Sequence, residues 1–348
     1  MAKKIIIIFL LLCTIAQAQE ERLLFTADTV IFRIAGMPDM QETQKQLDSI
    51  SIPSAVSNPV FRNAKKKFKV RFWSPSTLPK DAKTILFPPA ELKIGESVEL
   101  NIARPGEGGN SESAEDIPEE LSNLKVKYFW GSKDQQSEFL EWNNLPDMQK
   151  SAIVRQIYSE KGSIFHKSDY SCAYWPKSDT QKINQQAKLA GIYRLKSNYT
   201  DNIEIDIPES ITFLEPFSFT SPDLNKTQSF EKSIIFKWKQ IPNIMGLHAM
   251  IFGTNKDGSI IIWSSSESVD AEIISEEYPD YETIEKMVAD KIFMSPDQKE
   301  MKIPAKIFSE CESVFMIMNG YGNEYMFTDD NVQAQIKTKT SIMVMLKK

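Results

Sequence analysis

Apolar and polar residues alternate with a period of two along much of this chain. The stretch 234–238 is typical, because Ile234, Phe236 and Trp238 are separated by Ile235 and Lys237. This period is that of a β-strand with one buried face. On this pattern or on β-branched and aromatic content we expect strands at 23–34, 68–72, 98–102, 124–130, 191–195, 203–208, 234–238, 247–252, 260–263, 314–318, 325–327 and 341–346, the last at a sheet edge.

Turn residues connect some of these runs. Asp257-Gly258 stands between the apolar runs 247–252 and 260–263, which is a strong short-range hairpin signal. The glycine-containing stretch 319–323 predicts a second hairpin between the runs 314–318 and 325–327.

Three segments show helical spacing instead. Apolar residues recur at steps of three and four over 146–160, which predicts an amphipathic helix. A second helix is expected over 178–190, since Ser178 and Gln181 fit a capping box. A third, short helix is expected over 281–292, where Asp280 is placed to open it.

The order of features after residue 216 is similar to that of a known family. Trp238 is followed by Ile241-Pro242, a turn and a strand, which resembles the start of a fibronectin type III domain. The resemblance implies a β-sandwich over 216–348, with a helical insertion near 269–300. The strands between 19 and 142 suggest another sandwich. We therefore expect a mainly β protein: two immunoglobulin- or fibronectin-like β-sandwich domains joined by a small mixed α/β segment at 143–215.

The first residues read as an export signal. Lys3 and Lys4 precede the apolar run 5–12, and Ala16-Gln17-Ala18 offers small residues to a signal peptidase. The run is too short for a membrane span, which needs about 20 residues. We expect residues 1–18 to be removed, no transmembrane segment to remain, and the mature chain to be periplasmic or extracellular.

Charge narrows the choice of partner. The 348 residues include 41 basic and 47 acidic side chains, a net charge of −6, which argues against nucleic acid. The basic run 65–67 with Lys69 and Arg71 has two interpretations: it grips an anionic glycan, or it protects an edge strand from sheet-to-sheet pairing. The sequence favours the second. The expected partner is a protein or glycan of the cell envelope.

The sequence offers little for catalysis. Only His166 and His248 could serve an imidazole mechanism. His166, Asp169 and Cys172 follow at three-residue spacings, which suggests either a thiol–imidazole pair or a polar loop beside a buried cysteine. We favour the loop, and we expect His248 to face solvent from a strand or to be a hydrogen-bonded core histidine. Zinc and calcium motifs and phosphate-binding glycine loops are absent, so we expect no enzyme, metal or cofactor.

Two groups of residues remain as candidate sites. Tyr170, Tyr174 and Trp175 could stack on a ligand, or they could plug the junction between domains. Cys172 and Cys311 could form a disulfide, or they could be separate buried thiols. The expected function is that of an exported, non-catalytic interaction or structural protein. A carbohydrate-binding module is the alternative, followed by a secreted hydrolase.

Overall fold

The structure, a computed structural model, is mainly β. It describes residues 21–35, 64–75, 78–104, 125–133, 139–141, 144, 170–177, 183–268, 278–329 and 332–347. The strands are β1 (Glu21–Ile34), β2 (Lys65–Ser74), β3 (Thr84–Phe87), β4 (Val98–Glu99), β5 (Asn101–Ala103), β6 (Val126–Trp130), β7 (Leu140–Glu141), β8 (Ser171–Trp175), β9 (Gly191–Ser197), β10 (Ile203–Ile207), β11 (Phe219–Ser221), β12 (Ile234–Trp238), β13 (Ile244–Thr254), β14 (Ile260–Ser264), β15 (Glu300–Ile303), β16 (Ser313–Asp329) and β17 (Val332–Lys347).

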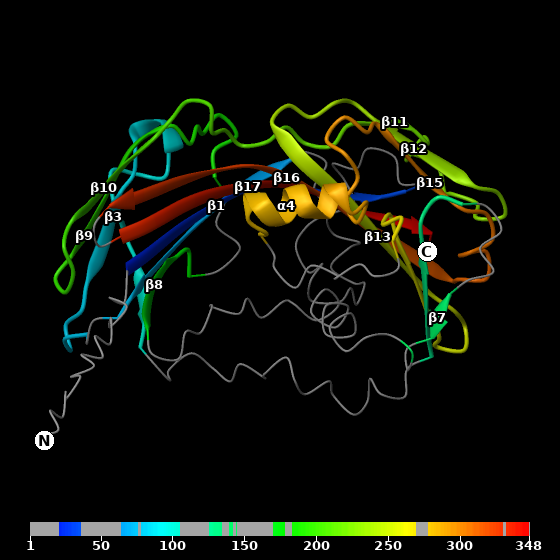
Figure 1. Ribbon diagram of the computed structural model, residues 1–348, viewed down its shortest axis with the longest axis horizontal. Helices are drawn as coiled ribbons and strands as arrows, with labels where there is room; N and C mark the ends of the chain where they lie inside the picture. The colour runs from blue at the N-terminus through cyan, green and yellow to red at the C-terminus, as the bar shows by residue number, and fades with distance from the viewer. Residues whose placement is uncertain are drawn as a thin grey trace, which may run out of the picture.

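A ten-stranded sheet runs through the whole molecule, in the order β5-β8-β2-β1-β17-β16-β13-β14-β6-β7. Its centre joins the two ends of the described chain, because β1 pairs in parallel with β17 from Glu21↔Val332 to Ile34↔Met345. Figure 1 shows β1, β16 and β17 side by side across the middle of the molecule. The sheet therefore depends on pairings between residues about as far apart in sequence as the chain allows.

Two smaller sheets cover one face of the large sheet. The four-stranded sheet β10-β9-β3-β4 lies over one half, and the three-stranded sheet β11-β12-β15 lies over the other (Figure 1). Each small sheet packs on the large sheet around a core of its own: the N-terminal core includes Leu195 of the four-stranded sheet, and the C-terminal core includes Phe236 of the three-stranded sheet. Strand β17 contributes to both, with Ala334 and Ile336 in the N-terminal core and Ile342 and Val344 in the C-terminal core. All four have even numbers, so they lie on the same face of the strand.

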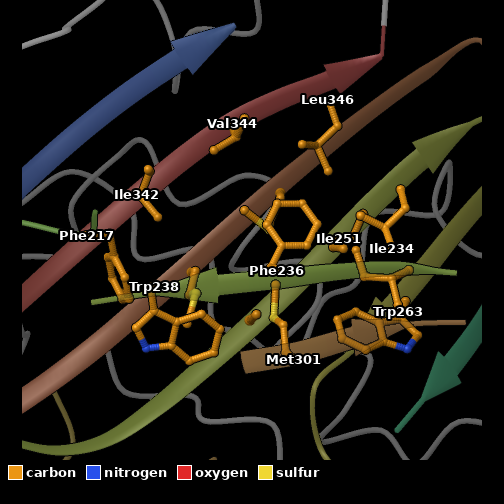
Figure 2. Packing of buried hydrophobic residues seen from close by; sticks show 14 of the residues in the cluster. Phe217, Ile234, Phe236, Trp238, Ile251, Trp263, Met301, Ile342, Val344 and Leu346 are labelled. Carbon is orange, nitrogen blue, oxygen red and sulfur yellow. The ribbon is translucent and has the colours of Figure 1, made fainter. Parts of the chain in front are cut away.

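The C-terminal core confirms the alternation that the sequence shows at 234–238. Ile234, Phe236 and Trp238 are buried, while Ile235 and Lys237 are exposed. Figure 2 shows the buried side chains of β12 directed toward residues of the large sheet, among them Ile251 and Val344. The ring of Trp238 meets that of Phe219 edge to face, with 6.2 Å between centroids.

The hairpin at Asp257-Gly258 and the third expected helix are also present. β13 and β14 pair antiparallel, the turn is closed by Asn255 N–H donating to Ser259 O at 2.9 Å, and Gly258 has φ +80°. Helix α4 (Tyr281–Ala289) begins where Asp280 accepts a hydrogen bond from Thr283 N–H, the geometry of an N-cap. Among the described residues, α4 is too short to cross a membrane, and no other helix is long and apolar enough to do so.

The helix expected over 178–190 is wrong in its described part, 183–190. Ile183 forms an isolated β-bridge with Lys66, and Lys188 N–H donates to Glu91 O. Ala187 and Leu189 are buried in the N-terminal core. Tertiary contacts thus satisfy this segment's backbone and bury its apolar residues without a helix. The helix expected over 146–160 and the export signal at 1–18 lie outside the described residues.

The second predicted hairpin, at 319–323, is also wrong. β16 continues through this stretch, with a register irregularity between Tyr321 and Glu324. The glycines serve close packing, because a Cβ at Gly320 would collide with Ile244 and one at Gly322 with Thr338. The strand at 341–346 belongs to β17, which lies inside the sheet and not at its edge.

The segments expected as separate domains share the large sheet. β2 comes from 19–142, β8 from 143–215 and β13 from 216–348, and all three are strands of the same sheet. The strand expected over 98–102 also connects sheets, since it divides at the buried Leu100 into β4 and β5. The mainly β character is confirmed, whereas an arrangement as two separate sandwich domains is not.

Candidate functional site

A cleft of about 430 Å³ opens between the edge of the three-stranded sheet and the turns that follow β6 and β14. Its inner wall includes the buried side chains of Trp263, Met294 and Met301. Its outer part includes the exposed carboxylates of Glu267 and Glu300. The cleft is mixed in character, because polar and charged residues, Lys302 among them, line it beside the apolar wall. Apolar surface and converging polar groups together make this cleft the main candidate.

The turn after β6 fixes one side of the cleft. Trp263 Nε1 donates to Gly131 O at 2.9 Å, and Gly131 N–H donates to Ser264 O at 3.1 Å. Ser132 N–H donates to Glu267 Oε1 at 3.1 Å. Gly131 has φ +77°, and a Cβ there would lie 3.0 Å from Glu267 Oε2. Glycine therefore provides both the left-handed backbone and the space for this carboxylate.

The other side of the cleft comes from β15 and the residues before it. Gln298 Nε2 donates to Glu300 O at 2.8 Å, and Glu300 Oε2 lies 3.0 Å from Lys237 Nζ. Both charged side chains of this pair are more than half exposed, so the pair contributes little to stability. It leaves a carboxylate at the rim that a partner's polar or cationic groups can reach.

His248 is a hydrogen-bonded core histidine, one of the two alternatives expected from the sequence. It lies on β13, its Nε2 is 3.0 Å from Ser264 Oγ, and its ring centroid is 5.5 Å from that of Phe293. Burial lowers the pKa of His248 to about 4, so the ring is neutral near neutral pH. A general base must lie within hydrogen-bonding reach of the proton that it takes. The His248 ring is buried and contributes to the packing of the sheet instead. His166 and Asp169 lie outside the described residues.

The three aromatic residues expected to act together do not share one face of β8. Trp175 pairs with Val70 and is buried in the N-terminal core, whereas Tyr174 pairs with Arg71 and is partly exposed. Successive strand residues point to opposite faces, so Tyr174 and Trp175 do not form one platform. Tyr170 precedes the strand and is partly exposed. A binding role for these residues stays a prediction.

The two cysteines are free and buried. Cys172 lies on β8, and Cys311 belongs to the C-terminal core. Burial raises the pKa of Cys172 to about 12, which the nearby Arg71 only partly offsets. The thiol is therefore protonated near neutral pH and is a poor nucleophile.

β8 covers only the second half of β2, from Val70 to Ser74. The lysine-bearing half pairs with β1 on one side and, on the other, forms one isolated bridge between Lys66 and Ile183. Protection of an edge by these lysines stays a prediction. Lys66 lies on the covered face, where its Nζ donates to Ala187 O at 2.9 Å and lies 4.8 Å from the ring centroid of Phe213. Burial lowers the pKa of Lys66. This lysine thus ties β2 to the segment that closes the N-terminal core.

A polar cluster that the sequence did not indicate lies at the centre of the large sheet. The Tyr278 hydroxyl donates to Asp28 Oδ2 at 2.5 Å, and Lys337 Nζ donates to Tyr278 O at 3.1 Å. Lys337 Nζ also lies 3.8 Å from Glu324 Oε2, and Lys339 Nζ is 4.2 Å from the ring centroid of Tyr278. Buried charges need such partners, so the cluster holds the segment before α4 on β1 and β17.

No single sequence signal indicated the cleft or the polar cluster. Glu267, Glu300 and Asp28 are separate carboxylates among 47 acidic residues, and only strand pairing brings each to its partners. Within the described ranges, no three or more histidine, cysteine, aspartate or glutamate side chains form a group that could hold a metal ion.

Comparison of the sequence with protein-family models and with curated proteins finds no match.

Proposed function

We propose that this chain is an exported, non-catalytic binding protein of the cell envelope or exterior, and that the cleft beside Trp263 holds its partner, a protein or a glycan. The cleft is the observation that carries this proposal. It combines a buried apolar wall with exposed carboxylates at Glu267 and Glu300. The backbone there is fixed by hydrogen bonds from Trp263 Nε1 to Gly131 O and from Ser132 N–H to Glu267 Oε1. Such preformed clefts are where proteins usually bind ligands.

The state of the described imidazole and thiol also supports a binding role over an imidazole or thiol mechanism. His248 is buried and neutral near neutral pH, and burial keeps the Cys172 thiol protonated. Neither side chain lines the cleft. Binding that depends on shape and on a few polar contacts requires no activated group.

The C-terminal half, about 216–348, is proposed to be a fibronectin type III-like sandwich. This half contains seven strands in chain order, β11 to β17. The first, second and fifth of them, β11, β12 and β15, form the three-stranded sheet. The other four are neighbours in the large sheet, in the order β17-β16-β13-β14. In an immunoglobulin-type sandwich the first, second and fifth strands share one sheet and the third, sixth and seventh share the other, and the same division here supports the proposal. The fourth strand, β14, lies in the second of these sheets. Domains of this class commonly serve recognition at cell surfaces, an argument by analogy of fold.

Export is proposed from the sequence at 1–18. The described fold begins at Glu21, two residues after the terminus that cleavage behind Ala18 would create. A mature chain from Gln19 would thus keep every described strand.

A photo-crosslinking experiment tests the cleft. A photo-reactive benzophenone amino acid is incorporated in place of Ile235, which lines the cleft and is 42% exposed. The variant is expressed in the organism that makes the protein, so that its native partners are present. The matched control replaces Ile192, an isoleucine that also points outward from a strand and is 39% exposed, on the four-stranded sheet. Irradiation should give a discrete adduct with the probe at 235 that is absent with the probe at 192. Identical patterns from both positions, or no adduct from position 235, would refute the proposal.

A further inference from the structure

The cleft runs along the edge of a strand. Strand β15 has one neighbour in the three-stranded sheet, β12, so its other side is a sheet edge within the part of the chain that the structure describes. Three successive residues of β15 line the cleft: Glu300, Met301 and Lys302. The space beside this edge is therefore where a further strand of the small sheet would lie.

The hydrogen bonds between β12 and β15 fix which backbone groups point to the cleft. Trp238 N–H donates to Lys299 O at 3.0 Å. The next pair, Lys237 and Glu300, is not a hydrogen-bonded one, since the two kinds of pair alternate along antiparallel strands. Glu300 therefore directs its N–H and C=O away from β12. Its carbonyl accepts from Gln298 Nε2 at 2.8 Å, whereas its N–H has no partner among the described residues.

The wall of the cleft suits apolar side chains from an added strand. Trp263, Met294 and Met301 are buried residues of the C-terminal core that also line the cleft. A strand added to β15 would lie about 4.8 Å from it and would share its pleat. Residues of that strand opposite Met301 would point toward this wall, and those opposite Glu300 would point outward.

A carboxylate on the opposite side of the cleft can receive a basic side chain. Glu267 is exposed, and its Oε1 accepts from Ser132 N–H at 3.1 Å. No lysine or arginine among the described residues forms an ion pair with it. Glu300, in contrast, lies 3.0 Å from Lys237 Nζ. Charge complementarity across an interface steers and orients a partner, so Glu267 favours a cationic group at this side of the cleft.

We propose that the cleft takes an extended segment of a partner protein, which adds as a strand to the edge of β15; the inference rests on the proposed function of the cleft. A backbone carbonyl of the segment accepts from Glu300 N–H, its alternate apolar residues lie against Trp263 and Met294, and a basic residue reaches Glu267. Main-chain hydrogen bonds give such strand addition its affinity, and the alternate side chains give it specificity. A glycan has no such backbone, and the one aromatic ring among the described lining residues, Trp263, is 1% exposed and offers no face to a sugar.

The crosslinking assay at Ile235 tests strand addition when it is combined with two variants of Glu300. Proline is tolerated at the first residue of an edge strand, so Glu300→Pro removes the outward N–H and keeps the pairing with β12. The matched variant Glu300→Ala loses the same carboxylate but keeps the N–H. The yield of adduct should be about tenfold or more lower with proline than with alanine, because the segment's carbonyl loses its donor. Equal yields from the two variants would overturn strand addition.

The identity of the adduct separates this inference from the proposed function. A crosslinked peptide in which apolar and polar residues alternate, with a basic residue among them, is the expected result. An adduct with a glycan, or with a second copy of this chain, overturns the inference and leaves the cleft as a binding site. No adduct from position 235 refutes the proposed function, and the inference with it.

Hydrogen exchange of the crosslinked protein decides the case in which Glu300→Pro does not fold. The amide of Glu300 should exchange about tenfold or more slowly in the adduct than in the protein before irradiation, because the added strand gives it an acceptor. An equal rate of exchange in the two samples would contradict strand addition.

Discussion

The burial of His248 predicts a specific loss of stability in mild acid. The unfolded histidine takes up a proton below its ordinary pKa of 6.5, whereas the folded one stays neutral down to about 4. In that window the unfolded state binds more protons, so the free energy of unfolding falls as the pH is lowered from about 6.5 to about 4. Above about pH 6.5 the contribution of this histidine is constant. One pKa unit corresponds to about 1.4 kcal/mol, so this group should cost about 2 kcal/mol at about pH 5 and about 3 kcal/mol at full protonation.

The assay is urea denaturation of the wild type and of His248→Asn at about pH 7.5 and about pH 5. Asparagine does not titrate, and its amide keeps a polar group beside Ser264. The raised pKa of Glu21 acts in the opposite direction but is common to both proteins, so it cancels in the comparison. The wild type should lose about 2 kcal/mol more than the variant over this interval. Equal losses in the two proteins would mean that His248 is not held neutral, which would refute its described burial.

Four further changes test the packing. Trp238→Ala should cost about 3–5 kcal/mol in chemical denaturation, because it truncates a buried ring on β12; a change below about 0.5 kcal/mol would contradict that burial. Trp175→Ala should lower the unfolding midpoint far more than Tyr174→Ala, since only Trp175 lies in the N-terminal core; equal effects would argue against their opposite orientations. Gly253→Ala should cost about 1–3 kcal/mol, since its Cβ would lie 2.6 Å from a cysteine sulfur, and an unchanged midpoint would refute that close contact. The isolated fragment 216–348 should aggregate or stay unfolded, because it exposes the sheet edges that β1 and β6 cover; a soluble fragment with a sharp unfolding transition would contradict this.

Local features of the fold could be predicted from the sequence. The alternation at 234–238 gave the buried face of β12 because period two depends only on neighbouring residues. Asp257-Gly258 gave the hairpin because the turn needs a residue that tolerates a positive φ. Asp280 gave the start of α4, where its carboxylate caps the helix.

The errors arose where distant contacts decide the outcome. Gly320 and Gly322 suggested a turn, but they are glycines because Ile244 and Thr338 pack against their backbone. Pairing of β1 with β17 joins opposite ends of the chain, and no local pattern encodes that partner.

The candidate site could not be predicted for the same reason. The cleft contains Gly131 from the turn after β6, Glu267 from the turn after β14 and Glu300 from β15, and only the folded sheets bring these residues together. Tyr174 and Trp175 looked like one aromatic cluster because adjacency in sequence was taken for adjacency of side chains. The pleat of β8 separates them.

Calorimetric unfolding of residues 19–348 tests most directly the claim that one sheet unites both cores and so fixes the cleft. Because β1, β16 and β17 carry side chains of both cores, the account predicts a single transition whose calorimetric and van't Hoff enthalpies agree. Two resolved transitions, with Trp238→Ala shifting only one of them, would show that the cores unfold independently and would contradict it.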